Sequence, residues 1–241
     1  MTDTAAPEPR RHFANSVELR SYVRENHGSR VLLSFSTGKD SIAAWIALQE
    51  SGFEVVPFYL YMVPGLEFVE ESLGYYERFF QVRIHRFPSP LMLRILRGLV
   101  YQPPERAADV EALATPSKLL RFDGMEDEIR KALRMPDDYT ANGVRAADSV
   151  QRALACKKNG VLHHKRRSFY PVFDWKMDDV VASLERARIK LPVDYRLFGR
   201  TFEGLQYQFL APVRKHFPRD YARILEFFPL ADLDLFRRGK L

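Results

Sequence analysis

The stretch VLLSFSTGKDSIAAWIAL, at residues 31–48, joins two apolar runs through a turn of small residues. Val31, Leu32 and Leu33 favour a strand, and residues 42–48 indicate a helix. A strand, a small-residue loop and a helix N-terminus together form an anion site, because free backbone N–H groups and the positive end of the helix dipole converge there. The stretch therefore predicts a phosphate-binding loop, whose contact residues we expect to be Ser36, Thr37, Gly38, Lys39, Asp40 and Ser41.

The loop lacks the Walker spacing Gly-x-x-x-x-Gly-Lys-Ser/Thr, because no glycine stands at position 33. The sequence STGKDS at residues 36–41 instead resembles the PP-loop (Ser-Gly-Gly-x-Asp-Ser) of the adenine nucleotide α-hydrolase-like superfamily. Its Gly-Lys-Asp-Ser part is most similar to the phosphoadenosine phosphosulfate (PAPS) reductase-like family. Thr37 stands where that pattern has glycine, and an ordinary strand–turn–helix junction is the alternative interpretation.

A second block, YMVPGLEFVE at residues 61–70, follows the next β-prone run. It resembles the Thr-Gly-x-Glu-Phe segment of the same family, with proline in place of threonine. The resemblance implies that Gly65 and Glu67 lie near the adenosine and the transferred group. The alternative is that Glu67 and Glu70 are first-turn carboxylates that complement a helix dipole.

A third block, GVRAADSVQR at residues 143–152, resembles the family motif Gly-x-Arg-x-x-Glu/Asp-Ser-x-x-Arg. Gly143 allows a tight turn at a strand end, and the fork of Arg145 can grip a phosphate or sulfate. Ser149 and Arg152 lie one turn apart on the expected helix at residues 146–157. The alternative is a helix start with solvated charges.

A fourth block, FYPVFDWKMDDV at residues 169–180, resembles a downstream stretch of the same family. Its expected role is structural, with Asp174 capping a helix that starts at Trp175. The preceding residues 165–167 (Lys-Arg-Arg) are candidate phosphate contacts.

Strands alternate with helices along most of the chain, which predicts an α/β fold with right-handed crossovers. We expect a Rossmann-like, doubly wound, mostly parallel sheet with helices on both faces and a helical C-terminal part. The expected strands are residues 31–36, 53–62, 82–87, 139–144 and 168–173. The resemblance implies the sheet order 3-2-1-4-5. The expected organisation is a flexible segment at residues 1–14, a PP-loop nucleotide-binding domain at 15–190, and a helical extension at 191–241 packed on it.

The composition restricts the cofactors and partners. The net charge of +6 and the pI near 9.4 favour anionic partners: an adenine nucleotide first, with nucleic acid as an open alternative. A single cysteine, Cys156, excludes an intramolecular disulfide, a Cys-based metal cluster and an iron–sulfur cluster. No apolar stretch is long enough for a membrane span, so we expect no membrane partner and a cytoplasmic location.

True reductases of the family carry a Glu-Cys-Gly-x-His motif near the C-terminus, which is missing from this sequence. The resemblance therefore implies an ATP pyrophosphatase or adenylyl transferase, an enzyme that cleaves ATP between the α- and β-phosphates and passes AMP to an acceptor. Lys39 and Arg145 would offset negative charge, and Asp40 would assist Mg²⁺ bound with the nucleotide; no intrinsic metal site is expected. The acceptor could belong to nucleic-acid or sulfur modification. Two alternatives remain open: a protein that binds adenosine phosphosulfate or PAPS, or is reductase-like, without the catalytic cysteine, and a non-catalytic nucleotide-binding subunit or nucleic-acid-binding partner.

Overall fold

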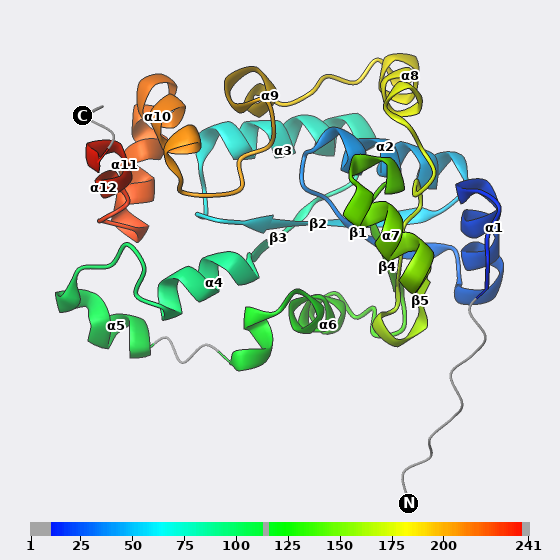
Figure 1. The fold of residues 1–241 in the computed structure, drawn as a ribbon, viewed down its shortest axis with the longest axis horizontal. Helices are drawn as coiled ribbons and strands as arrows, with labels where there is room; N and C mark the ends of the chain where they lie inside the picture. Colours follow the sequence, from blue (N-terminus) through cyan, green and yellow to red (C-terminus); the bar gives the residue numbers. More distant parts are fainter. Residues whose placement is uncertain (1–10, 113–115, 238–241) are drawn as a thin grey trace, which may run out of the picture.

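A computed structural model describes residues 11–112 and 116–237 of the chain, and its centre is a six-stranded sheet of order β3-β2-β1-β4-β6-β5 (Figure 1). All neighbouring strands pair in parallel except β5, which runs antiparallel to β6. The strands are β1 (Arg30–Ser34), β2 (Glu54–Tyr61), β3 (His85–Pro88), β4 (Tyr139–Asn142), β5 (Leu162–His163) and β6 (Ser168–Phe169). The predicted α/β, Rossmann-like fold class is confirmed. The order agrees with 3-2-1-4-5 when β6 counts as the fifth strand, and β5 is an edge strand that the sequence did not predict.

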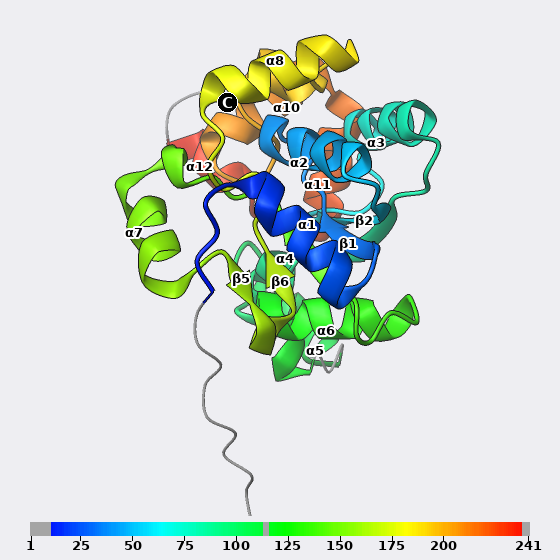
Figure 2. The same ribbon diagram turned by 90° about the vertical axis from the view of Figure 1, so that its right-hand side faces the viewer.

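Helices cover both faces of the sheet (Figures 1 and 2). One face carries α2, α3 and α8, and the other carries α4, α5 and α6. The helices are α1 (Ser16–His27), α2 (Lys39–Glu50), α3 (Glu67–Phe80), α4 (Pro90–Arg97), α5 (Ala107–Ala112), α6 (Phe122–Ala132), α7 (Val150–Asn159), α8 (Met177–Ala187), α9 (Val193–Phe198), α10 (Tyr207–His216), α11 (Pro218–Phe227) and α12 (Asp232–Arg237).

Alternation along β1 explains this arrangement. Val31 and Leu33 point into the large hydrophobic cluster that contains α2, whereas Leu32 points into a smaller cluster with Met125 and Ile129 of α6. Successive side chains of a strand face opposite sides of a sheet, so one short apolar run anchors helices on both faces. The β1 strand is therefore buried on both sides, as expected for a central parallel strand.

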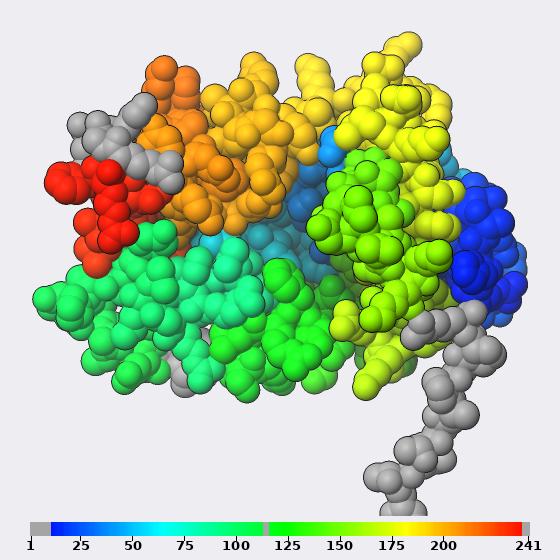
Figure 3. All heavy atoms as spheres, in the orientation of Figure 1, coloured from blue at the N-terminus to red at the C-terminus, as the bar shows by residue number. Residues whose placement is uncertain are grey.

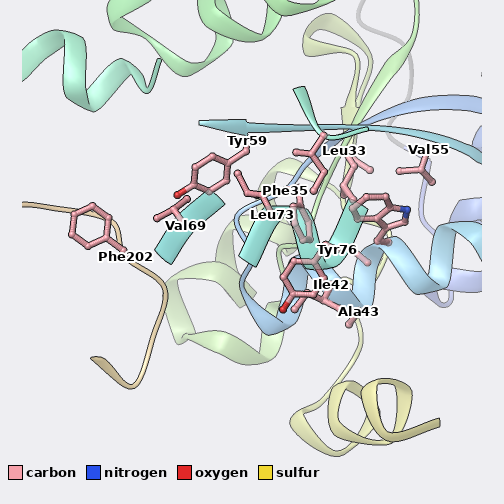
Figure 4. Packing of buried hydrophobic residues seen from close by; sticks show 14 of the residues in the cluster. Leu33, Phe35, Ile42, Ala43, Val55, Tyr59, Val69, Leu73, Tyr76 and Phe202 are labelled. Atoms are coloured by element: carbon pink, nitrogen blue, oxygen red, sulfur yellow. The ribbon is translucent and has the colours of Figure 1, made fainter. Parts of the chain in front are cut away.

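Aromatic side chains pack around Phe35, the residue that directly follows the end of β1 (Figure 4). The ring of Phe35 packs edge-on against Trp45 and Tyr76, at centroid distances of 5.1 and 5.2 Å. Trp45 in turn stacks on Phe80 at 3.9 Å. Because Phe35 directly precedes the expected phosphate-binding loop, the core holds the start of that loop in place.

Several element boundaries differ from the sequence-based expectation. The strand expected at 168–173 ends at Phe169, because Pro171 cannot donate a ladder hydrogen bond. The helix expected at 146–157 is a 3₁₀ turn (Ala146–Asp148) followed by α7. Within residues 191–241, where the sequence predicted a helical extension, the structure has α9, α10, α11 and α12. Most of the expected flexible segment 1–14 lies outside the described residues.

Candidate functional site

The loop between β1 and α2 takes a sharp turn at Thr37. Its φ angle is +59°, in the left-handed region, and its side chain is buried. The hydroxyl group of Thr37 donates to the carbonyl oxygen of Ser36 at 2.6 Å. A β-branched residue rarely takes this conformation, so the loop holds strained backbone where the related PP-loop pattern has glycine.

Hydroxyl oxygens accept the backbone N–H groups of this loop. The N–H of Ser36 donates to Ser41 Oγ at 3.3 Å, and the N–H of Gly38 donates to Ser36 Oγ at 3.4 Å. The N–H of Lys39, in the first turn of α2, donates to the hydroxyl of Tyr195 at 3.0 Å. The first N–H groups of a helix lack intrahelical partners and favour anions. Phosphate oxygens could therefore replace these hydroxyl acceptors, two of which are at long distances.

A polar cavity of about 580 Å³ opens onto this loop. In the space-filling view it corresponds to the hollow between α7 (yellow-green) and the orange segment that follows α9, with blue residues at its floor (Figure 3). Three cations and two carboxylates line it together with hydroxyl and amide groups. The lining residues are Ser34, Ser36, Gly38, Lys39, Asp40, Ser41, Asn142, Gly143, Val144, Arg152, Tyr195, Gly199, Arg200, Thr201 and Glu203.

A second, more apolar cavity of about 470 Å³ adjoins the first at the carboxyl ends of β1 and β2. The two cavities share Ser34, Ser36, Thr201 and Glu203. Its other lining residues are Phe35, Tyr59, Leu60, Met62, Ser89, Leu91, Phe122, Phe202, Gln206, Gln208 and Phe209. Burial raises the pKa of the Tyr59 phenol, so its hydroxyl is neutral at physiological pH. Ligands of open α/β sheets bind at the carboxyl ends of the strands, where both cavities lie.

A chain of alternating charges runs behind the loop. Asp40 lies 2.9 Å from Lys39 Nζ through one carboxylate oxygen and 2.7 Å from Arg145 Nε through the other. Arg145 also pairs with Asp148, which pairs with Arg152. Arg145 is only 2% exposed and does not line either cavity, whereas Arg152 is half exposed and lines the polar cavity. Of these two arginines, Arg152 therefore reaches the cavity, and Arg145 holds two carboxylates in place.

Gly143 brings the end of β4 against the start of α2. A Cβ atom at this position would lie 2.9 Å from the carbonyl carbon and oxygen of Asp40 and from the nitrogen of Ser41. Real Cβ contacts are not this short, so glycine is needed for the close approach. Ser149 has a local role: its hydroxyl caps α7 by accepting the N–H of Arg152 at 3.1 Å. Ser149 does not line either cavity.

The structure separates Gly65 and Glu67 from the loop region. Neither residue lines either cavity. The carboxylate of Asp220, from α11, accepts the N–H groups of Glu67 at 2.6 Å and Phe68 at 3.1 Å and so caps the N-terminus of α3. The Glu67 side chain is 60% exposed and lies 3.6 Å from Arg219. These contacts fit the alternative in which Glu67 is a surface carboxylate in the first turn of a helix.

The fourth sequence block also takes a different place from the one expected. Asp174 accepts the N–H of Ser16 at 3.1 Å and does not cap α8, whose first turn is capped by Asp179. Residues 165–167 precede β6, at the amino end of the sheet, while the cavities lie at its carboxyl ends. Arg167 lies 3.4 Å from Asp137 in that region.

Sequence reasoning missed one wall of the site. Asn142 ends β4, and a polar residue at a strand end could have been recognised as a candidate. The segment that contains Tyr195, Arg200, Thr201 and Glu203 matches no motif and lies far along the chain from the loop. Asp194 fastens this segment, because its carboxylate accepts the N–H of Phe202 at 2.9 Å. Burial raises the pKa of Asp194.

No family model and no curated protein matches the sequence. Solved structures with some similarity include PAPS reductase from Candida auris in a phosphate complex, at 10% identity and a TM-score of 0.49, over 79% of this chain and 87% of that chain. They also include NH₃-dependent NAD synthetase from Campylobacter jejuni, at 11% identity and a TM-score of 0.46, over 94% of this chain and 94% of that chain. A predicted subunit of tRNA methyltransferase from Methanocaldococcus jannaschii matches at 15% identity and a TM-score of 0.35, over 80% of this chain and 91% of that chain.

No helix in residues 11–112 and 116–237 is both long and apolar enough to cross a membrane. Within the same ranges, no group of three or more His, Cys, Asp and Glu side chains is arranged to hold a metal ion. The fold and the site define an α/β protein with a Rossmann-like sheet and a polar loop that joins the carboxyl end of its central strand to the N-terminus of α2.

Proposed function

We propose that this chain binds an adenine nucleotide across the two cavities and cleaves ATP between the α- and β-phosphates, passing AMP to an acceptor. One observation carries the proposal: a polar cavity at the N-terminus of α2 and a more apolar cavity at the ends of β1 and β2 share Ser34 and Ser36. A nucleotide likewise consists of a polyanionic phosphate chain, which suits the polar cavity, and a flat base, which suits the more apolar cavity. Adenine as the base rests on the resemblance of residues 36–41 to the PP-loop.

The polar cavity supplies the groups that a triphosphate needs. Lys39, Arg152 and Arg200 supply positive charge, and the hydroxyls of Ser36 and Ser41 can donate to phosphate oxygens. Phosphate transfer in such a site depends mainly on positioning and charge neutralisation. Arg145 would contribute through Asp40 and Asp148 and not by direct contact, a change from the expected phosphate grip.

Nucleotides bind proteins together with Mg²⁺, which is held through their phosphates. When bound with the nucleotide, Mg²⁺ would neutralise phosphate charge. Both carboxylate oxygens of Asp40 face cations, Lys39 and Arg145, so Asp40 does not fit the role of a metal ligand in this arrangement. The ion would be held by the phosphates themselves.

The more apolar cavity suits the base. Phe35, Met62 and Leu91 offer apolar contact, and the side-chain amides of Gln206 and Gln208 can pair with ring nitrogens. An adenine ring in this cavity would place the ribose and α-phosphate at the shared wall.

Titration calorimetry in the presence of Mg²⁺ tests the proposal, with ATP, adenosine phosphosulfate and PAPS as ligands. We expect the tightest binding for ATP and a loss of about tenfold or more for Lys39→Ala, because a charged contact to phosphate is removed. Lys131→Ala is the matched control, because Lys131 is an exposed lysine paired with Glu128 on α6. Tighter binding of a sulfo-nucleotide would favour a protein that keeps the reductase-type ligand without the cysteine. No binding of any of the three nucleotides would overturn the proposal.

A further inference from the structure

Under the proposed function, the wall shared by the two cavities would contact the α-phosphorus, which is the reacting atom. With the base in the apolar cavity and the β- and γ-phosphates on the loop, the α-phosphate lies between Ser34, Ser36, Thr201 and Glu203. Three of these side chains carry hydroxyl groups, which suit an anion. Glu203 carries a carboxylate, which does not.

The position of Glu203 is restrained. Its carboxylate pairs with Arg200 three residues earlier, in the segment that Asp194 fastens through the N–H of Phe202. The side chain is 52% exposed, so it is open to a molecule that enters from solvent. Like charges a few ångströms apart repel even in water, so a carboxylate here weakens nucleotide binding. The same carboxylate can accept a proton from a nucleophile held against the α-phosphate.

We infer that Glu203 is a catalytic base and that the acceptor is a neutral nucleophile, an amine or an alcohol; this inference rests on the proposed function. The lone pair of the acceptor nitrogen or oxygen forms a bond to the α-phosphorus. The bond from the α-phosphorus to the bridging oxygen breaks, and its electron pair leaves with pyrophosphate. The proton of the nucleophile passes to the Glu203 carboxylate. An anionic acceptor such as a carboxylate or sulfate is repelled by Glu203 and has no proton to transfer.

The first test measures ATP affinity by calorimetry at low salt. Glu203→Gln removes the repulsion and keeps the size of the side chain, so we expect binding about fivefold tighter than in the wild type. The substitution also frees Arg200, which could itself attract phosphate. Arg200→Gln and the double variant Arg200→Gln/Glu203→Gln are therefore compared as well, because neither has the Arg200 charge. We expect the double variant to bind ATP more tightly than Arg200→Gln. Unchanged or weaker binding in both comparisons would overturn the inference.

The second test measures pyrophosphate release from ATP with two small probes, hydroxylamine as a neutral nucleophile and acetate as an anionic one. We expect hydroxylamine to stimulate release more than acetate at equal concentration. We expect Glu203→Gln to lower the hydroxylamine-dependent rate about 100-fold, the scale of general base catalysis. Stimulation by acetate that equals or exceeds that by hydroxylamine would contradict the inference.

The two proposals fail in different ways. A wild-type chain that does not bind ATP refutes the proposed function. A wild-type chain that binds ATP, with Glu203→Gln unchanged in affinity or in the hydroxylamine-dependent rate, refutes only the role of Glu203. Glu185→Gln, an exposed carboxylate on α8, is the control for a general effect of charge.

Discussion

Thr37 holds a left-handed backbone conformation in the middle of the loop, where the related pattern has glycine. Two substitutions separate its backbone strain from its hydrogen bond. Thr37→Val keeps the strain and loses the donation to the carbonyl of Ser36, so we expect the free energy of unfolding to fall by about 1–2 kcal/mol. Thr37→Gly also loses the hydrogen bond to Ser36, but it relieves the backbone strain. We therefore expect the free energy of unfolding to change by less than about 1 kcal/mol. Urea unfolding measures both, and a larger loss for glycine than for valine would contradict this account.

Arg145 and Arg152 share the partner Asp148 but differ in burial. Arg145→Ala leaves Asp40 and Asp148 without their buried cation, so we expect about 3 kcal/mol of lost stability and weaker ATP binding. Arg152→Ala removes an exposed charge, so we expect less than about 1 kcal/mol of lost stability, with ATP binding weakened nonetheless. Chemical unfolding and calorimetry on both variants separate the two effects. Equal stability losses would show that the burial of Arg145 is not energetically important.

At the scale of the elements, α6 carries a carboxylate in an unfavourable place. Burial raises the pKa of Glu126 to about 7, even though Arg130 lies 3.6 Å away, because Arg130 is also bound by Asp127, Thr140 and backbone carbonyls. Between pH 4.5 and 7 the unfolded chain loses this proton and the folded chain keeps it. Stability therefore falls as the pH rises through this window, by about 2–3 kcal/mol if Glu126 acts alone.

Glu126→Gln should remove most of this pH dependence, because glutamine does not titrate. Urea unfolding at a series of pH values from 4.5 to 7.5 measures it. Glu185→Gln, on the exposed face of α8, should leave the dependence as in the wild type. A wild-type chain whose stability rises across this window would show that burial of Glu126 does not dominate.

The elements that the sequence predicted well are those with local signals. The run at residues 31–33 and the apolar helix after Ser41 predicted β1, α2 and the loop between them, because strand, turn and helix signals all lie within one short stretch. Gly65, Glu67 and Ser149 also matched motifs but do not line either cavity. The N-terminus of α3, at Glu67, is capped by the distant residue Asp220, whereas Ser149 makes a local cap on α7. The wall at Tyr195 and Glu203 could not be predicted, because nothing local in the sequence indicates which distant segment packs over the loop.

At the scale of the whole molecule, the candidate site joins parts of the chain that lie far apart in the sequence and meet only in the fold. A ligand that binds the folded chain alone stabilises it by RT ln(1 + [L]/Kd). ATP at 100 times its Kd should therefore raise the free energy of unfolding by about 2.7 kcal/mol. Thermal or chemical unfolding with and without ATP measures this, and Lys39→Ala should show a much smaller increase at the same ATP concentration. An equal increase in the variant would place the binding elsewhere.

The hydrogen bond from the Lys39 N–H to the Tyr195 hydroxyl links residues 156 positions apart. During synthesis, the loop at residues 36–41 leaves the ribosome long before the segment that forms the opposite wall of the cavity. Under the proposed function, affinity for the nucleotide therefore arises only after residues 195–203 have been made and have packed over the loop. Under the proposed function, a nucleotide stabilises only those chains in which the segment around Tyr195 has packed over the loop, and it does not stabilise chains cut before that segment.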